Sequence, residues 1–368
     1  MRGPSTTRGQ SLQIGAILLF GFLLIGLTTA QASLVPADVS RAELDHSQRV
    51  ADQAVALSTA AFETRVTGRP QPTTLDLGPD YPDRLLFVYP PPAAGTLRTT
   101  EPSTLAIDNA AAVTDNGSFD TFWNGTSRSY ETRAITYEPR YRELDAAPRY
   151  RLEHGVLAAR HDSAASIEMA ANRQPVVDET EISLLVVDGE LSATGIDTES
   201  VVIERVTDAT TVEIDNSGGP IRLRLPTQLP AATWRDTILD SQSAVDSVAV
   251  AGDVATVTLD SAETYELTIH KLTVGTNATA SSATYLRNAS GTDSDYSFDV
   301  RDQYNDRIDG TATVWVYNDS NYGSPYTSFT VPADPQPRPP GERCYTLRKG
   351  VTDVDAPATY ESTAGGCS

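Results

Sequence analysis

The sequence contains little cysteine, lysine, histidine or tryptophan. Its 368 residues include 2 cysteines, 4 histidines and 3 tryptophans. The two cysteines, Cys344 and Cys367, cannot supply the four ligands of a structural zinc site, and no histidine is near them in the sequence. Outside the cytoplasm, such a neighbouring pair is more typical of a disulfide than of a metal site. We therefore expect a Cys344–Cys367 disulfide and no bound metal.

Common catalytic motifs are also missing. The sequence has no GxSxG, no P-loop, no GxGxxG and no HExxH. Four histidines occur, and none has the spacing of metal ligands: His46, His154, His161 and His270. Each is expected to be structural or solvated. The sequence predicts no catalytic residue, no cofactor and no enzymatic activity.

Positive charge is scarce as well. The chain has 28 basic against 49 acidic residues, a net charge of −21, and its only lysines are Lys271 and Lys349. An acidic, lysine-poor chain is suited to very salty water, which screens self-repulsion. A coding bias toward arginine is the alternative explanation. Either way the charge disfavours nucleic acid as a partner, because binding it requires a basic surface.

Long apolar runs are limited to one, the stretch 12–32. A helix of about 20 apolar residues spans a bilayer core of roughly 30 Å. Arg2 and Arg8 precede this stretch, and the first acidic residue after it is Asp38. The positive-inside rule then places the start of the chain in the cytoplasm and the remainder outside. We expect a single-pass protein of the cell membrane with an extracellular bulk.

The start of the apolar stretch carries a recognisable junction. Arg8-Gly9-Gln10-Ser11, followed at once by the apolar helix, resembles the class III signal peptides of archaeal type IV pilin-like proteins. That resemblance implies cleavage between Gly9 and Gln10, with the helix retained. The chain departs from the family at Ile14, where many pilins carry glutamate.

A second processing site is present at the end of the apolar stretch. Ala30-Gln31-Ala32 has the small-x-small form of an ordinary signal-peptidase site. Cleavage between Ala32 and Ser33 would release a soluble protein. The sequence therefore allows two outcomes: the apolar helix is retained as an anchor, or it is removed with the signal peptide.

Residues 36–67 have the pattern of an amphipathic helix. Apolar residues recur at helical spacing at Val50, Ala54, Leu57 and Ala61. Pro36 is at the join with the apolar stretch, where it can kink or restart a helix. A membrane helix, an amphipathic helix and then β-structure is the layout of pilins.

Beyond Pro70 the sequence consists of short alternating runs separated by turn residues, which is typical of strands. The expected strands are 85–89, 134–138, 182–187, 200–206, 210–214, 221–225, 247–251, 255–259 and 265–272. One helix is expected at 231–242, with Trp234 and Ile238 on its buried side. Many short strands at this spacing predict a β-sandwich over residues 68–272.

A small polar segment, 273–288, marks a boundary before a last domain, 273–368. The run FDVRDQYNDRIDGTATVWVYN (298–318) resembles the bacterial immunoglobulin-like repeats of surface adhesins. In it, Trp315 is expected to be a core anchor or an exposed contact residue. A proline-rich loop, 333–342, interrupts the expected strands.

The sequence also contains Asn-x-Ser/Thr sequons in loop-like contexts. The expected glycosylation sites are Asn116, Asn124, Asn277, Asn288 and Asn318.

Together these patterns predict a mainly β protein. The expected order is a leader (1–11), a transmembrane or pilin-like helix (12–35), an amphipathic helix (36–67), a β-sandwich domain (68–272) and an immunoglobulin-like domain (273–368). The expected function is non-catalytic: a membrane-anchored surface protein of a halophilic cell envelope, pilin-like or adhesin-like, whose partners are the membrane and other envelope or pilin-like proteins. One alternative is a ligand- or glycan-binding ectodomain, with a pocket using Trp123 or Trp315. Another is a surface hydrolase with two carboxylates in a cleft.

Overall fold

The computed structural model describes most of the chain. The described residues are 7–82, 87–113, 122–161, 166–172, 176–206, 209–240, 242–291, 295–308, 312–318, 322–331, 336–337, 344–347 and 359–361.

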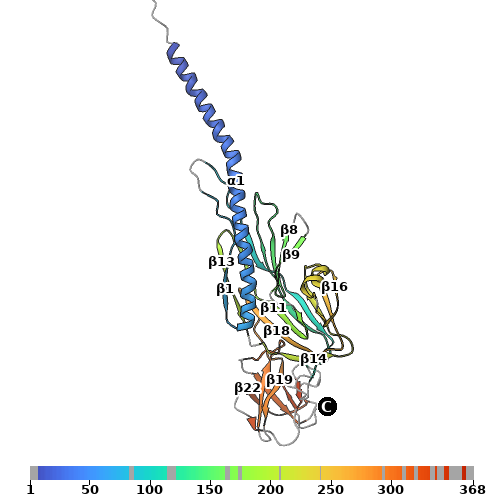
Figure 1. The fold of residues 1–368 in the computed structure, drawn as a ribbon. Coiled ribbons are helices and arrows are strands. Elements are labelled where there is room, and N and C mark those ends of the chain that lie inside the picture. The colour runs from blue at the N-terminus through green and yellow to red at the C-terminus, as the bar shows by residue number, and fades with distance from the viewer. Residues whose placement is uncertain are drawn as a thin grey trace, which may run out of the picture.

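One long helix, α1 (Thr7–Thr67), forms the start of the described chain. It runs without interruption through Pro36, so of the two outcomes expected at that residue, a kink or a restart, the helix does not restart. A proline inside a helix removes one backbone hydrogen bond and crowds the preceding turn, which bends a helix more readily than it breaks one. Figure 1 shows α1 changing direction slightly where it meets the sheets. The helix also begins earlier than expected, because residues 7–11 of the predicted leader are helical.

Three sheets follow α1. The first sheet contains β1 (Gln71–Asp76), β4 (Ala110–Ala112), β10 (Val177–Asp178), β11 (Glu181–Asp188), β13 (Thr198–Arg205), β14 (Val212–Asn216) and β18 (Tyr265–Val274). The second contains β2 (Gly95–Thr99), β6 (Ile135–Glu138), β7 (Arg149–Glu153), β8 (Val156–His161), β9 (Ser166–Asn172) and β12 (Ser192–Gly195). The third contains β3 (Ser103–Asp108), β5 (Arg128–Thr132), β15 (Arg222–Pro226), β16 (Val245–Ala251) and β17 (Val254–Leu259). Among the described strands of these sheets, β11 and β18 pair in parallel, and the other pairs are antiparallel.

The first sheet is the central layer. Alternation along β11 sends Ile182, Leu184 and Val186 into one core and Leu185 and Val187 into another. The first core is shared with the third sheet, and the second with α1 and the second sheet. Because successive side chains of a strand point to opposite faces, a strand with cores on both faces reads as the continuous apolar run seen at 182–187.

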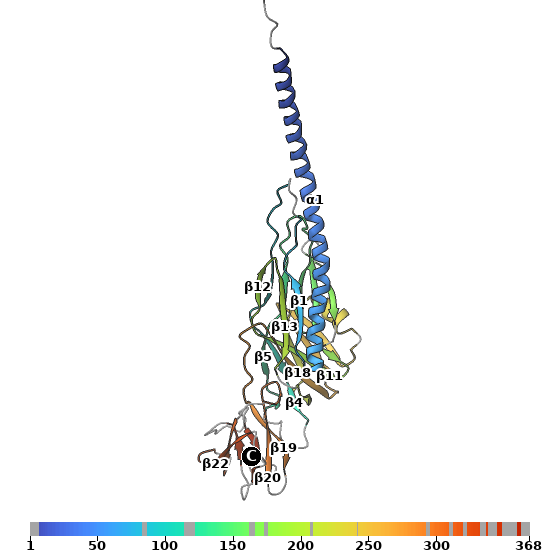
Figure 2. The same cartoon turned by 90° about the vertical axis from the view of Figure 1, so that its left-hand side faces the viewer.

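Helix α1 packs along this central layer with the face that its sequence predicts. Val50, Ala54, Leu57 and Ala61 are all buried in the second core. Figure 2 shows the helix running alongside β1 and β13, and α1 contacts both strands.

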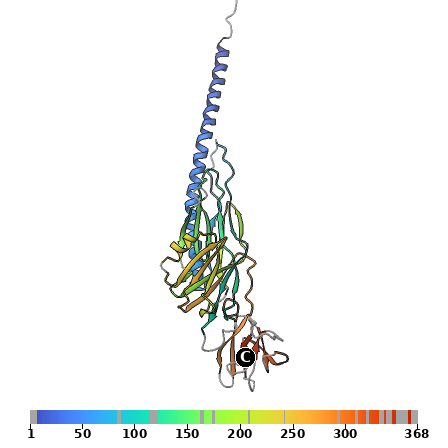
Figure 3. The same cartoon turned by 90° about the vertical axis from the view of Figure 1, so that its right-hand side faces the viewer.

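Two smaller sheets form the last part of the chain. One contains β19 (Tyr285–Gly291), β20 (Asp295–Arg301) and β23 (Gln336–Pro337). The other contains β21 (Ala312–Tyr317), β22 (Pro325–Val331), β24 (Cys344–Thr346) and β25 (Thr359–Glu361). Leu286 and Val300 of the first sheet pack against Val314, Val316 and Tyr345 of the second. These sheets lie at the end of the molecule farthest from the free end of α1 (Figures 1 and 3).

The prediction of a mainly β protein with one long apolar helix is confirmed. Two local predictions are wrong. Residues 87–89 of the expected strand 85–89 form no strand, and 85–86 are outside the described residues. The helix expected at 231–242 is shorter, one turn of α2 (Ala231–Thr233) followed by a π-helical turn, η1 (Trp234–Ile238). Trp234 and Ile238 are buried as expected.

Candidate membrane anchor and its docking site

The first part of α1 exposes large apolar side chains to its surroundings. These are Ile14, Ile17, Leu18, Leu19, Phe20, Phe22, Leu23, Leu24, Ile25 and Leu34. The 21 residues from Ile14 to Leu34 rise about 31 Å at 1.5 Å per residue, close to the thickness of a bilayer core. Within the described part of the chain, α1 is the one helix long and apolar enough to cross a membrane.

The surroundings of α1 change at Val35. From here to Thr64, buried residues recur every three or four positions, at Val35, Val39, Glu43, His46, Val50, Ala54, Leu57, Ala61 and Thr64. This spacing places all of them on one face of the helix. The exposed part of the helix therefore ends at Leu34, and the docked part begins at the next residue, Val35.

Glu43 is a buried carboxylate on the docked face. Its Oε1 accepts hydrogen bonds from the Arg142 backbone N–H (2.7 Å) and the Tyr81 hydroxyl (2.6 Å). Its Oε2 accepts from the backbone N–H groups of Glu143 (2.8 Å) and Leu144 (3.0 Å). Charge-assisted hydrogen bonds of this kind compensate for burying a carboxylate. Glu43 thus ties the helix to the loop that connects β6 and β7.

A second loop reaches further along the helix. The side-chain amide of Gln31 donates to the Val88 carbonyl (2.6 Å) and accepts from the Val88 N–H (3.1 Å), as a neighbouring strand would. The hydroxyl of Tyr89 donates to Asp38 (2.8 Å). Together with Glu43 these contacts line one side of α1 and are called the collar below; it is made by Gln31, Asp38 and Glu43 with the segments 81–82, 87–89 and 142–144.

His46 completes the collar from the next turn of the helix. Its Nδ1 lies 2.6 Å from the Tyr141 hydroxyl, and the two rings meet edge to face. Burial, with a contribution from the charge of Arg49, lowers the pKa of His46. Glu43 and His46 are polar, and the sequence pattern did not identify them. They precede Val50 by seven and four residues, and this helical spacing, which places them on the same face as Val50, could have predicted their burial.

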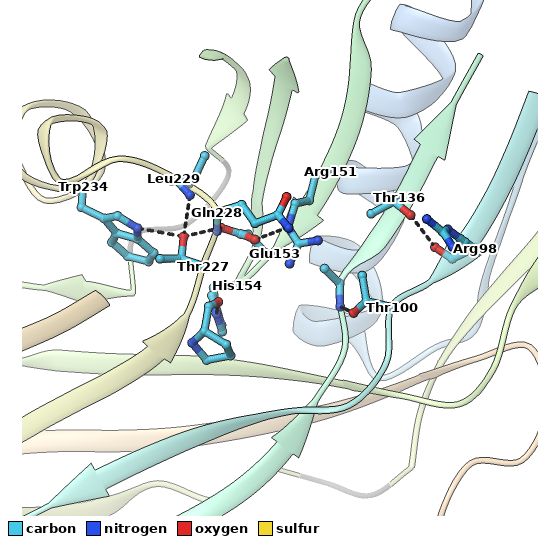
Figure 4. A network of polar contacts seen from close by, with 12 residues as sticks. Arg98, Thr100, Thr136, Arg151, Glu153, His154, Thr227, Gln228, Leu229 and Trp234 are labelled. Atoms are coloured by element: carbon cyan, nitrogen blue, oxygen red, sulfur yellow. Dashed lines mark hydrogen bonds and ion pairs between the residues drawn. The ribbon is translucent and has the colours of Figure 1, made fainter. Parts of the chain in front are cut away.

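A buried polar network connects two sheets beneath the helix (Figure 4). The carboxylate of Glu153, at the end of β7, accepts hydrogen bonds from the Thr227 hydroxyl and the Gln228 N–H. It also pairs with Arg151. The Trp234 indole donates to the Thr227 hydroxyl (3.0 Å). These contacts satisfy groups from three elements, so the network holds the π-helical turn against the β7–β8 hairpin.

The junction with the last two sheets contains a buried lysine. Lys271 of β18 forms an ion pair with Asp188 (3.1 Å), donates to the Thr279 carbonyl (2.6 Å) and lies 5.4 Å from the centre of the Tyr304 ring. Burial alone would raise the pKa of Asp188, but hydrogen bonds from Thr279, Lys271 and Gly189 together lower it. Lys271 is therefore a structural cation at the boundary between domains.

The turn at residues 302–306 docks at this junction. Asp302 accepts from the N–H groups of Tyr304 (2.8 Å) and Asp306 (3.0 Å) within the turn. Asn305 donates to the Thr210 carbonyl (3.0 Å), and Tyr304 enters the first core. The turn thus belongs to the contact between domains.

A cleft of about 260 Å³ at this junction has Asp188 and Asp302 in its lining. Burial raises the pKa of Asp302, whereas that of Asp188 is lowered. Two carboxylates with opposite shifts are the pattern of an acid–base pair. Both side chains, however, hold backbone N–H groups in place, and the hydrolase alternative has no further support among the described residues.

The two tryptophans named for the expected glycan-binding pocket pack against other described side chains. Trp123 is 1% exposed and belongs to the first core. Trp315 is partly buried against Tyr317 and Tyr322. A groove of about 680 Å³ runs past Glu199 and Asn277, and no aromatic side chain is among the described residues that line it.

The predicted processing sites are both helical. Gly9 and Gln10 belong to the first turns of α1, and Ala32 and Ser33 are exposed just before its docked part. Cleavage after Ala32 would separate Gln31 from its partner Val88. Neither cleavage is tested by the structure, and both stay predictions.

The predicted modification sites are scattered over the β-domains. The Asn277 amide is exposed and donates to Glu190 (2.9 Å), Asn318 is exposed, and Asn124 is half-buried with its carbonyl bonded to Thr126. Asn288 is in β19, and Asn116 is outside the described residues. Cys344 is disulfide-bonded, and Cys367 is outside the described residues.

Comparison of the chain with protein-family models, curated proteins and solved structures finds no match.

Proposed function

We propose that this chain is a non-catalytic, single-pass membrane protein that presents its β-domains on the outside of the cell. One observation carries the proposal: α1 exposes a bilayer-length apolar surface and then, from Val35 onward, packs into the protein. Exposing about ten large apolar side chains to water is unfavourable for a monomeric protein, whereas a bilayer would cover them. Arg2 and Arg8 before the stretch support an outward orientation of the rest.

The arrangement of the domains supports a display role. The two C-terminal sheets lie at the end of the molecule opposite the free end of α1 (Figure 1). With the exposed part of α1 in the membrane, these sheets would be the part of the protein farthest from the cell. A pilin-like or adhesin-like envelope protein fits this geometry. The excess of acidic residues and the scarcity of lysine, which occurs only twice, support an envelope exposed to high salt.

The end of the collar at Gln31 would lie at the membrane surface. Val88 is 81% exposed and is bonded to Gln31, near the end of the apolar stretch. Phe87 and Tyr89 flank it, and aromatic residues favour the interface between lipid and water. We infer that the tip of this loop rests on the lipid surface beside the helix.

Membrane partition and the mature N-terminus test the proposal directly. The full chain would be expressed in a high-salt archaeal host, the membranes washed with alkaline carbonate, and the N-terminus sequenced. A chain that starts at Gln10 and stays in the washed membranes supports an anchor processed like a pilin. A chain that starts at Ser33 in the medium overturns the anchor.

A tryptophan at the loop tip tests the position of the collar. Val88→Trp in bilayers should be quenched by lipids brominated near the headgroup, whereas Ile196→Trp, on a β-domain, should not. Equal quenching at the two sites would contradict contact between the loop and the lipid surface.

A further inference from the structure

A small cavity lies where the end of α1 meets β11 and the β7–β8 turn. Its volume is about 20 Å³, and Ser58, Arg65, His154 and Ser183 are among its lining residues. A space of this size holds one species as small as a water molecule or a halide ion. The cavity is apart from the collar and from the exposed part of α1.

Three polar atoms in the lining have no hydrogen-bond partner among the residues that the structure describes. They are the Ser58 hydroxyl, the Arg65 Nε–H and the His154 Nδ1. Ser58 is 2% exposed and His154 is 7% exposed. Buried polar atoms in proteins are nearly always hydrogen-bonded, so three of them around one cavity point to a species that binds there.

The charge around the cavity favours an anion over water. Among the residues that the structure describes, no carboxylate forms an ion pair with Arg65. Arg205 donates to the Arg65 carbonyl (3.0 Å), and the charges of Arg65 and Arg205 both act on nearby His270. The Arg65 guanidinium is half-buried, its Nη1 donates a hydrogen bond to the Ser183 hydroxyl, and burial lowers its pKa to about 10. A bound anion would supply the missing charge, which water cannot.

We propose that this cavity binds one small monovalent anion, such as chloride, held by the Ser58 hydroxyl, the Arg65 Nε–H and the His154 ring. The anion accepts hydrogen bonds from Ser58 and Arg65. It thereby joins α1 to the β7–β8 turn and neutralises the Arg65 charge at the base of the docked helix.

The histidine makes binding depend on pH. His154 Nε2 lies 2.8 Å from the Pro226 carbonyl, which can only accept, so Nε2 carries a proton. A neutral ring then offers a lone pair at Nδ1, and an anion requires a second proton there. Burial opposes that proton most and lowers the pKa of His154; of the charged groups facing the ring, Glu153 favours the proton, and Arg151 and Arg65, which lines the same cavity, oppose it. From β11 and η1 the ring meets the uncharged Ser183 and Trp234. Binding of the anion is therefore accompanied by proton uptake and strengthens as the pH falls.

Thermal unfolding of the full chain in detergent tests the site. Sodium chloride or bromide would replace sodium gluconate at constant ionic strength, since gluconate is too large for the cavity. Halide should raise the midpoint by about 2–4 °C in a saturable way, with a larger shift at pH 6 than at pH 8. Arg65→Gln and Ser58→Ala should lose this shift, and Arg41→Gln, an exposed position on the same helix, should keep it.

Ser58→Ala keeps the test decisive if Arg65→Gln does not fold. Without a bound anion, removing an unpartnered hydroxyl would be neutral or stabilising, and the halide shift would be the same in the variant. An equal shift in the parent and Ser58→Ala proteins, or no difference between halide and gluconate, would overturn the proposal. A shift that does not change between pH 6 and pH 8 would overturn the role of His154. In crystals soaked in bromide, anomalous density beside Arg65 Nε supports the site, and an ordered water there refutes it.

Discussion

The exposed and docked halves of helix α1 have the same backbone structure and opposite surroundings. From Ile14 to Leu34 the helix is apolar on all sides and touches little of the protein, whereas from Val35 to Thr64 one narrow face is buried. A helix that is apolar all round requires an apolar solvent, and one with a single apolar stripe requires a protein surface. One continuous helix can therefore support the β-domains with one half and serve, as proposed, as an anchor with the other.

The comparison also shows where polar groups are tolerated. In the exposed half, Thr28, Thr29 and Ser33 hydrogen-bond to helix carbonyls three or four residues earlier, which would satisfy their hydroxyls in the proposed lipid environment. In the docked half, Glu43 and His46 instead bond to loops of the β-domain. The polar residues of the docked half are thus satisfied by the β-domain, whereas those of the exposed half are satisfied by the helix itself.

Charges in the exposed half should have the largest effect. The double variant Leu19→Arg, Leu23→Arg should insert less well by about 6 kcal/mol, because each arginine at the centre of a span costs about 3 kcal/mol. Carbonate washing of membranes would measure the change as a shift of the protein from the membrane to the soluble fraction. The matched control, Ile196→Arg, lies on an exposed part of the β-domain and should stay in the membrane. Equal retention of both proteins would contradict a span at this position.

Truncating one leucine in each half to alanine should affect the stability of the folded protein only in the docked half. Leu57→Ala removes a side chain that is 5% exposed in the second core, so unfolding should become easier by about 3 kcal/mol. Leu19→Ala, at a position that is 72% exposed, should leave the unfolding of the β-domains unchanged. Urea unfolding of both variants in detergent, followed by near-ultraviolet circular dichroism, would measure the difference. A comparable loss in Leu19→Ala would mean that the exposed half also packs on the protein.

Removing the Glu43 carboxylate from the collar should have the next largest effect on docking of the helix. Glu43→Gln places an amide NH₂ among backbone N–H groups that need acceptors, which should destabilise docking by about 2 kcal/mol. Hydrogen exchange should show faster exchange at Arg142, Glu143 and Leu144. Asp45→Asn, two residues away and exposed, is the matched control and should leave their exchange unchanged. Unaltered exchange in Glu43→Gln would show that the carboxylate does not hold this loop.

The elements with a simple period could be predicted from the sequence. The stripe from Val50 to Ala61 and the alternating or apolar strands such as 182–187 and 221–225 are where the pattern places them. The spacing of apolar residues determines which face is buried, and this spacing is visible in one sequence. The sheets to which these strands belong were not visible: Gly218 and Gly219 connect β14 and β15, which belong to different sheets.

The misses have physical causes. Residues 87–89 have the composition of a strand, yet Val88 pairs with the side chain of Gln31 instead of with a backbone partner. Glu43 and His46 are polar residues on an apolar stripe, and only the loops that contact them explain their burial. The cavity between Ser58, Arg65 and His154 brings together segments that are almost a hundred residues apart, which no local pattern can indicate.

Lowering the pH should reduce the stability of the protein around the end of the docked half, because His270 lies there, and this effect should be the smallest of the four. Burial and the charges of Arg65 and Arg205 lower the pKa of His270 from 6.5 to about 3. The folded protein therefore binds fewer protons at this site than the unfolded chain, and its stability falls as the pH drops below about 6.5 toward 3. Between pH 7 and pH 5 the loss should be up to about 2 kcal/mol, at about 1.4 kcal/mol per pH unit once the unfolded histidine is charged. His270→Gln should remove this part of the pH dependence, while Thr268→Ala, two residues earlier on the same side of β18, should keep it. Urea unfolding at constant salt from pH 7 to pH 5 would measure both variants. Parallel pH profiles of the parent and His270→Gln proteins would mean that acid does not act on the docked half of the helix through this histidine.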